Sequence, residues 1–302
     1  MKVSVLVPVY NGELHLAECL DSILAQNFRD LEILIADDGS SDDSPGIIQS
    51  YAARDARIRW WRNSPNLGMV RNFDACIREA RGEYIKFVLQ DDKLFSASAI
   101  QRMAEALDNH SSAVLVGSRQ HITGAKTKPL IFSKKSRMYN GKEMVVACLE
   151  QNSNLIGQPT LTMFRKSAYK QPLDSRFIGH LDFALWFQLL EHGDFFYLTD
   201  ALGTWRVHED QQTAKFEKNG ASNHEHLLFV EAYYARPWLQ EMATDRMLFA
   251  QIYYLRKHYG ADADHLTTAM MSQLSPRRYA WQWLKHKISH PMQKLARKFH
   301  RE

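Results

Sequence analysis

The first ninety residues alternate short apolar runs with stretches of helical periodicity, and this alternation constrains the fold more than any other feature of the chain. The runs are rich in β-branched residues and begin at Val3, Leu31, Ile58 and Tyr84. Strands that alternate with helices in this way form a sheet of doubly wound type. We therefore expect an α/β fold with a mixed, mainly parallel sheet flanked by helices.

Pairs of acidic residues follow two of these runs. Asp37 and Asp38 come after the second run, and Asp91 and Asp92 end the run that starts at Tyr84. Ligands of open α/β sheets bind beyond the carboxyl ends of the strands, and Mg²⁺ and Mn²⁺ prefer carboxylate oxygen. Acidic pairs are also ordinary turn residues that stop a strand. The pairs alone leave both interpretations open.

Glycine-rich phosphate loops are absent from the turns after the first strands. None of these turns reads Gly-x-Gly-x-x-Gly or matches a Walker loop, which disfavours a dinucleotide dehydrogenase and a P-loop enzyme. A nucleotide, if one is bound, would be held by side chains and a metal ion.

A second segment that contains a candidate catalytic residue is Gly179–Trp186. Leu185, Trp186, Leu189 and Leu190 predict a helix, with Asp182 in its first turn. A carboxylate there gains up to about 1 kcal/mol from the helix dipole, so capping is one role for Asp182. Apolar runs at 195–198 and 203–208 predict two further strands.

The bulk composition is that of an ordinary globular protein. The 302 residues are 45% hydrophobic and 24% charged, and we expect neither a membrane-spanning helix nor a signal peptide. The three cysteines show neither metal-binding nor disulfide spacing, which indicates buried thiols in a reducing cytoplasm.

Positive charge is concentrated at the C-terminal end. Residues 275–302 contain eight basic residues and one acid, a formal charge of +7, which leaves −3 for residues 1–274 of a chain whose total is +4. Aromatic residues such as Trp281 and Trp283 lie among these basic residues. This mixture suits an anionic membrane surface; a helix that caps the acidic body and a disordered end are the alternatives.

Five segments in order resemble the family 2 inverting glycosyltransferases with the GT-A fold, of bacterial polysaccharide or O-antigen type. They are Val5–Gly12, Ile35–Asp42, Asn66–Asn72, Gly82–Asp92 and Trp205–His208. The resemblance implies a GT-A nucleotide-sugar-binding and catalytic domain over residues 1–215. Residues 216–302 would be a helical extension with a basic amphipathic tail.

The reaction that the resemblance implies is transfer of a sugar with inversion. The donor would be a nucleoside diphosphate sugar, with UDP favoured, and the acceptor a hydroxyl of a glycan or lipid-linked molecule. Mn²⁺ or Mg²⁺ would be the cofactor. We expect a cytoplasmic protein, peripheral on the inner face of the membrane through 276–302, that binds no nucleic acid.

The resemblance also implies roles for single residues. Asp38 would accept the imide N–H of the base, Asp91 would bind ribose or the sugar, and Asp182 would be the general base. Asp92 and His208 would bind the metal ion. The complete set of implied nucleotide-binding residues is Pro8, Val9, Tyr10, Asn11, Asp37, Asp38, Arg71 and Asp91.

Two positions depart from the family pattern. Leu89 and Leu181 stand where the family often has acids, so the metal site has one protein ligand fewer and the base lacks an acidic neighbour. A catalytically inactive GT-A-like binding or scaffold protein is therefore an alternative. A sugar nucleotidyltransferase is less well supported, because Tyr10–Glu13 is not a glycine-rich basic pyrophosphate loop.

Overall fold

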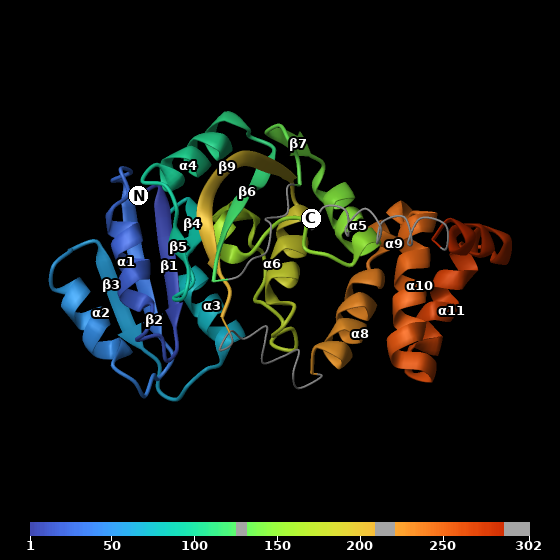
Figure 1. The fold of residues 1–302 in the computed structure, drawn as a ribbon, viewed down its shortest axis with the longest axis horizontal. Helices are drawn as coiled ribbons and strands as arrows, with labels where there is room; N and C mark the ends of the chain where they lie inside the picture. The colour runs from blue at the N-terminus through green and yellow to red at the C-terminus, as the bar shows by residue number, and fades with distance from the viewer. Residues whose placement is uncertain (125–131, 209–220, 287–302) are drawn as a thin grey trace. The chain divides into compact units, whose positions relative to one another are not determined.

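The computed structural model describes residues 1–124, 132–208 and 221–286 (Figure 1). The chain forms two compact units. One consists of Met1–Met144 and Asn154–Glu225, and the other of Val145–Ser153 and His226–Glu302. The first unit contains the sheet and its flanking helices, and the described part of the second is helical.

The parallel half of the sheet is built from the first four strands, in the order β3-β2-β1-β4. They are β1 (Val3–Val9), β2 (Leu31–Asp37), β3 (Ile58–Arg62) and β4 (Tyr84–Phe87), and every pairing among them is parallel. Both β1 and β2 are buried along their whole length, which explains why their sequences are mostly apolar. Their carboxyl ends meet at one edge of the sheet.

The other half of the sheet is mixed. β8 (Thr162–Arg165) runs antiparallel between β4 and β6 (Ala113–Thr123). β9 (Asp194–Arg206) lies parallel to β6 and antiparallel to the short strands β5 (Lys93–Leu94) and β7 (Arg137–Tyr139). β5 directly follows Asp91 and Asp92 in the sequence. Its pairing with β9 therefore places the end of β9 close to these two acids.

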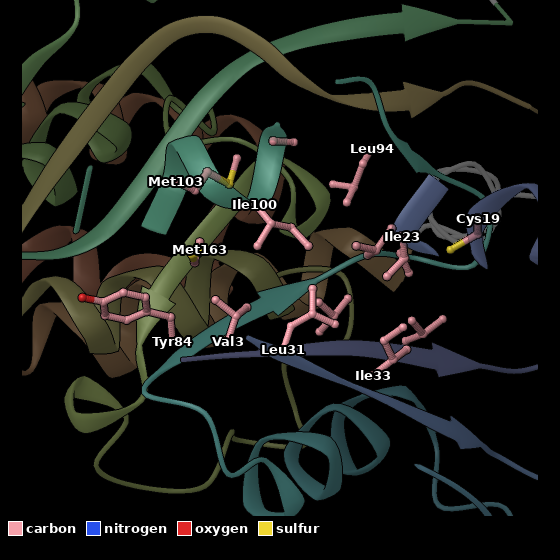
Figure 2. Close-up of a cluster of buried hydrophobic side chains, with 14 of the residues drawn as sticks. Val3, Cys19, Ile23, Leu31, Ile33, Tyr84, Leu94, Ile100, Met103 and Met163 are labelled. Atoms are coloured by element: carbon pink, nitrogen blue, oxygen red, sulfur yellow. The ribbon is translucent and has the colours of Figure 1, made fainter. Parts of the chain in front are cut away.

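One face of the sheet is covered by α1 (Leu16–Leu24), α2 (Ser44–Ala52) and α4 (Ala99–Asn109). Alternate residues of β1 point to this face, where their side chains form the main core with residues of the three helices. Figure 2 shows members of this core, including Val3 of β1 and Ile100 of α4.

The opposite face is covered by α3 (Met69–Glu79) and α6 (Leu181–Leu190). Phe73 of α3 stacks on Phe87 of β4 with ring centroids 4.5 Å apart, and Trp186 of α6 meets Phe164 of β8 edge to face. These aromatic contacts orient α3 and α6 against the strands that lead to the acidic pair.

The second unit is formed by short helices. They are α9 (Pro237–Met242), α10 (Asp245–Tyr259) and α11 (Asp264–Gln273), followed by helical residues 276–286. The helices α5 (Gly141–Gln151) and α8 (Ala221–Tyr234) contribute residues to both units. No helix in the described parts of the chain is long and apolar enough to span a membrane.

The predicted α/β architecture with C-terminal helices is confirmed. The two strands expected at 195–198 and 203–208 are one continuous strand, β9, while β5, β7 and α11 have no predicted counterpart. The domain boundary predicted at residue 215 lies outside the described residues.

Candidate functional site

Hydrogen bonds tie together the loops that follow β1, β2 and β4. The backbone N–H and carbonyl of Tyr10 bond the side-chain amide of Gln90, at 2.8 and 3.0 Å. Asn11 has a φ of 50° and accepts from the Ser41 amide at 2.8 Å. Pro8 and Val9 are buried in β1, whereas the Tyr10 ring is 53% exposed. Of these four predicted residues, Tyr10 and Asn11 are therefore the two that are exposed to a ligand.

The carboxylates of Asp37 and Asp38 are both buried but differ in their partners. Asp38 accepts from the amides of Leu67 and Gly68, at 2.8 and 2.9 Å, and from the Asn63 side chain at 2.9 Å. Asp37 Oδ1 accepts from an amide in its own turn. Its Oδ2 lies 3.1 Å from Arg62 Nε, without an aligned hydrogen bond. Asp37 thus keeps more acceptor capacity than Asp38.

The second acidic pair meets the end of β9. Asp92 is 3% exposed, and its Oδ1 accepts from the Arg206 amide at 3.0 Å. Asp91 Oδ2 lies 3.1 Å from His208 Nε2, and the Asp91 carbonyl accepts from Arg206 Nε at 2.9 Å. More than a hundred residues separate these partners in sequence. The structure therefore brings together three of the predicted residues, Asp91, Asp92 and His208.

Burial and the adjacent Asp91 charge raise the pKa of Asp92 to about 7. A buried carboxylate next to a like charge favours its protonated form unless a cation compensates. Carboxylate oxygen and imidazole nitrogen are suitable ligands for Mn²⁺. Asp91, Asp92 and His208 thus fit a divalent cation in their chemistry and in the unfavourable charge they place together.

The protein supplies only part of a coordination shell at this position. Within residues 1–124, 132–208 and 221–286, no three His, Cys, Asp or Glu side chains gather closely enough to enclose a metal ion. Magnesium-type ions bind near phosphates through one or two carboxylates, with substrate oxygens filling other positions. The site thus suits a cation that arrives with a diphosphate.

Asp182 lies in the first turn of α6 and is partly exposed. Its Oδ1 accepts from the Phe183 amide at 2.8 Å, and its Oδ2 from Asn154 Nδ2 at 2.7 Å. Burial of the carboxyl raises the pKa of Asp182. The bond to Phe183 realises part of the capping role, but each carboxylate oxygen has a second lone pair for another partner.

A short segment links Asp182 to the acidic pair. Asn154, which holds Asp182, is six residues before Thr160, whose hydroxyl hydrogen-bonds Asp92. Six fully extended residues span about 20 Å, and this segment ends in a 3₁₀ turn, η1 (Pro159–Leu161), which shortens it. The segment between the partners of the two carboxylates therefore spans less than about 20 Å.

Several residues in the site have no counterpart among the predicted ones. Asn154 and Arg62 are single polar residues in unremarkable sequence. Lys86 interrupts an apolar strand, and it is fully buried. The presence of a charged residue within an apolar run is the sequence feature that could have identified it. Glu225 accepts from the amides of Gly179 and His180 at 3.0 and 2.7 Å and so anchors the start of α6. Predicted Arg71 is exposed in the first turn of α3.

Comparison with protein families finds one matching family. The model described as Glycosyl transferase family 2 matches residues 4–172, more than half of the chain. This range includes both acidic pairs, Asn154 and Thr160, and it ends before α6.

Curated relatives carry the similarity further along the chain. An uncharacterised glycosyltransferase of Rickettsia typhi is 27% identical over 216 residues, covering 70% of this chain and 65% of that protein. The Campylobacter jejuni GalNAc(5)-diNAcBac-PP-undecaprenol beta-1,3-glucosyltransferase is 27% identical over 230 residues, covering 72% of this chain and 69% of that protein. The chain spans 36% of the Bacillus subtilis glycosyltransferase EpsJ, to which it is 39% identical over 125 residues.

Solved structures share the fold. Staphylococcus aureus TarS 1–349 superposes with a TM-score of 0.64 at 17% identity, covering 94% of this chain and 78% of that chain. A Pyrobaculum calidifontis mannosyltransferase, solved with GDP-Man and Mn²⁺, superposes with a TM-score of 0.59 at 14% identity, covering 93% of this chain and 83% of that one. At these identities the similarity establishes the architecture.

Proposed function

The chain belongs to glycosyl transferase family 2, and we propose that it moves a sugar from a nucleoside diphosphate sugar to a hydroxyl group with inversion at the anomeric carbon. The observation that carries this proposal is the meeting of Asp91 and Asp92 with Arg206 and His208 at the carboxyl edge of the sheet. This position is where open α/β sheets bind their ligands. The donor we favour is a UDP-sugar, since a TarS structure was solved with UDP-GlcNAc.

The acidic pair and His208 would hold Mn²⁺ or Mg²⁺ together with the donor diphosphate. When bound, the cation neutralises charge that develops on the leaving phosphate. The Arg206 amide donates to the Asp92 carboxylate, and Arg206 Nε donates to the Asp91 backbone carbonyl. Arg206 thus orients both acids. Asp92 would be ionised in the cation complex, because the positive charge of the ion would offset the burial and the Asp91 charge that raise its pKa.

Asp182 would accept the proton of the attacking hydroxyl. A positioned general base contributes on the order of 10² to 10⁴ in rate. The raised pKa of Asp182 makes it a stronger base than an exposed aspartate, and the Asn154 amide fixes its orientation. Attack from the side opposite the diphosphate inverts the anomeric centre.

The nucleotide base would be read at the carboxyl end of β2, by Asp38 with Asp37 beside it. Both carboxylates are buried: Asp38 accepts from Asn63, Leu67 and Gly68, and Asp37 Oδ2 lies 3.1 Å from Arg62 Nε. Tyr10, whose ring is 53% exposed at the end of β1, would form the lip of the pocket.

The acceptor we propose is a glycan or lipid-linked molecule at an anionic membrane surface. The Campylobacter relative is named for a reaction on an undecaprenol-linked glycan. Residues 276–286 are helical, and at 100° per residue Arg277, Trp281, Leu284 and Lys285 fall on one side. Trp281 and Leu284 are 57% and 45% exposed. On the other side Tyr279 and His286 pack on Phe249 of α10.

Release of UDP from a panel of UDP-sugars, with and without Mn²⁺, tests this function directly. We expect release from at least one UDP-sugar that depends on the cation and increases with a suitable acceptor. Binding of UDP without release from any UDP-sugar would favour the alternative, an inactive binding or scaffold protein. The absence of acids at Leu89 and Leu181 keeps that alternative relevant.

A further inference from the structure

Lys86 is fully buried in the middle of β4. A buried ammonium is costly unless its protons are hydrogen-bonded. Its Nζ donates to the backbone carbonyl of Thr160 and, at 3.0 Å, to that of Thr162. These carbonyls lie at the end of η1, where helical hydrogen bonding stops and carbonyl groups need other donors. Lys86 supplies those donors from the neighbouring strand.

The turn that Lys86 holds is in contact with the acidic pair. Thr160 Oγ1 accepts from the Leu89 amide at 3.1 Å and hydrogen-bonds Asp92. From the other side β9 approaches so closely that a Cβ on Gly203 would lie 2.6 Å from the Thr160 carbonyl oxygen. Thr160 is thus packed between the two strands that deliver residues to the site.

The same stretch of chain leads back to Asp182. Asn154 Nδ2 donates to Asp182 Oδ2, and Trp186 Nε1 of α6 donates to the Gly157 carbonyl at 3.0 Å. Residues 154–160 are therefore fixed to α6 at one end and to β4 at the other. Movement of the turn at Thr160 away from β4 would change the spacing between the two halves of the site.

We propose that Lys86 is a positioning residue that sets the distance between the acidic pair and Asp182 by holding the Thr160–Thr162 turn against β4. This inference rests on the proposed function, in which the acidic pair holds the donor and Asp182 takes the acceptor proton. An apolar side chain of equal length would fill the space but remove the two hydrogen bonds that Lys86 donates to these carbonyl groups. The turn would then relax toward other partners.

Lys86→Met tests the proposal, because methionine is similar in length and has no donor. The measurements are sugar transfer, donor hydrolysis by water, and the Kd for UDP, with the UDP-sugar that the wild-type protein turns over. We expect kcat for transfer to fall about 10- to 100-fold, hydrolysis to change far less, and the Kd for UDP to stay within about twofold. Ile85→Val, in the same buried strand, is the matched control and should keep the wild-type ratio of hydrolysis to transfer.

Loss of folded protein lowers both rates together and leaves their ratio unchanged, so an unchanged ratio in Lys86→Met overturns the proposal. Hydrogen–deuterium exchange gives a readout that needs no activity. Amides of residues 156–162 should exchange at least about tenfold faster in the variant, while β1 and β2 stay as in wild type. Exchange that is unchanged, or faster throughout the sheet, also overturns the proposal.

If the methionine variant does not fold, Lys86→Leu, which likewise has no donor, undergoes the same measurements with the same criteria. A wild-type protein that transfers sugar from no nucleoside diphosphate sugar refutes the proposed function. The exchange measurement still decides whether Lys86 holds the turn, so the two failures are distinguishable.

Discussion

Asp92 lies in surroundings that oppose its own charge. Burial of the carboxyl and the Asp91 charge raise the pKa of Asp92 to about 7. Burial of the Lys86 ammonium lowers the pKa of Lys86 to about 7. In the cation-free protein the folded state therefore holds the Asp92 proton more tightly than the unfolded chain does. The Asp92 contribution to stability consequently decreases as the pH rises from about 4 to about 7.

A pH dependence of cation binding follows from this shift. Mn²⁺ must displace the Asp92 proton, so its affinity in the presence of UDP should fall about tenfold per pH unit below 7 and level off above it. Calorimetric titration of Mn²⁺ between pH 5.5 and 8.5 measures this. Asp92→Asn is the control and should remove most of the binding. An affinity that does not change between pH 5.5 and 7 would contradict this account of the site.

Single residues of the site were predictable to different degrees. The acidic pairs and His208 stand out because they follow strand-like runs or match a family segment. The different hydrogen-bond partners of Asp37 and Asp38 were not predictable, since they depend on which carboxylate the loop at Leu67 and Gly68 contacts. Asn154 was not predicted, because its role comes from a contact with a residue 28 positions away.

At the scale of elements, Asp38 joins β2 to the start of α3. Its carboxylate holds two backbone amides in the loop before α3 and the Asn63 side chain after β3. Gly68 in that loop has a φ of 81°, a conformation that glycine adopts without strain. The loop therefore depends on a buried acceptor as well as on a glycine.

Asp38→Ala should lower the free energy of unfolding by roughly 2–4 kcal/mol, because it leaves two amides in the loop without their acceptor. Urea denaturation measures the loss. Asp30→Ala is the matched control, since the Asp30 side chain is 65% exposed and forms an ion pair with the N-terminus; it should change stability by less than about 0.5 kcal/mol. Equal stability of the two variants would show that Asp38 does not hold the loop.

Long elements were predictable from local pattern and short ones were not. β1 and β2 have seven residues each and are mostly apolar, and α1 and α3 have clear helical periodicity. The strands β5 and β7 have two and three residues, too few for any periodicity, and they exist because β9 provides hydrogen-bonding partners. Pairing between distant segments likewise fused two predicted strands into β9.

At the scale of the whole molecule, the charge asymmetry divides the chain into an acidic body and a basic end. The described part of that end, residues 276–286, presents Trp281 and Leu284 beside basic residues, and Lys285 lies over the Trp281 ring at 5.1 Å. An exposed apolar pair among cations matches the interface of an anionic bilayer.

Flotation with vesicles of phosphatidylglycerol or phosphatidylcholine tests the membrane proposal. We expect the full chain to float with the anionic vesicles, less so at high salt, and not with the neutral ones. A double variant, Trp281→Ala with Leu284→Ala, should lose about tenfold or more in affinity. Trp60→Ala, which removes an exposed tryptophan of β3, should bind as the wild type does. Failure of the wild-type chain to float with either vesicle would refute the proposal.

We propose that Asp182 deprotonates the acceptor at a site whose donor half is formed separately by the acidic pair. Transfer rate and UDP affinity of Asp182→Asn, measured on the same preparation, test it most directly. We predict a loss of transfer of about 10² to 10⁴, with the Kd for UDP within about twofold of wild type. Turnover at the wild-type rate in this variant would contradict the claim.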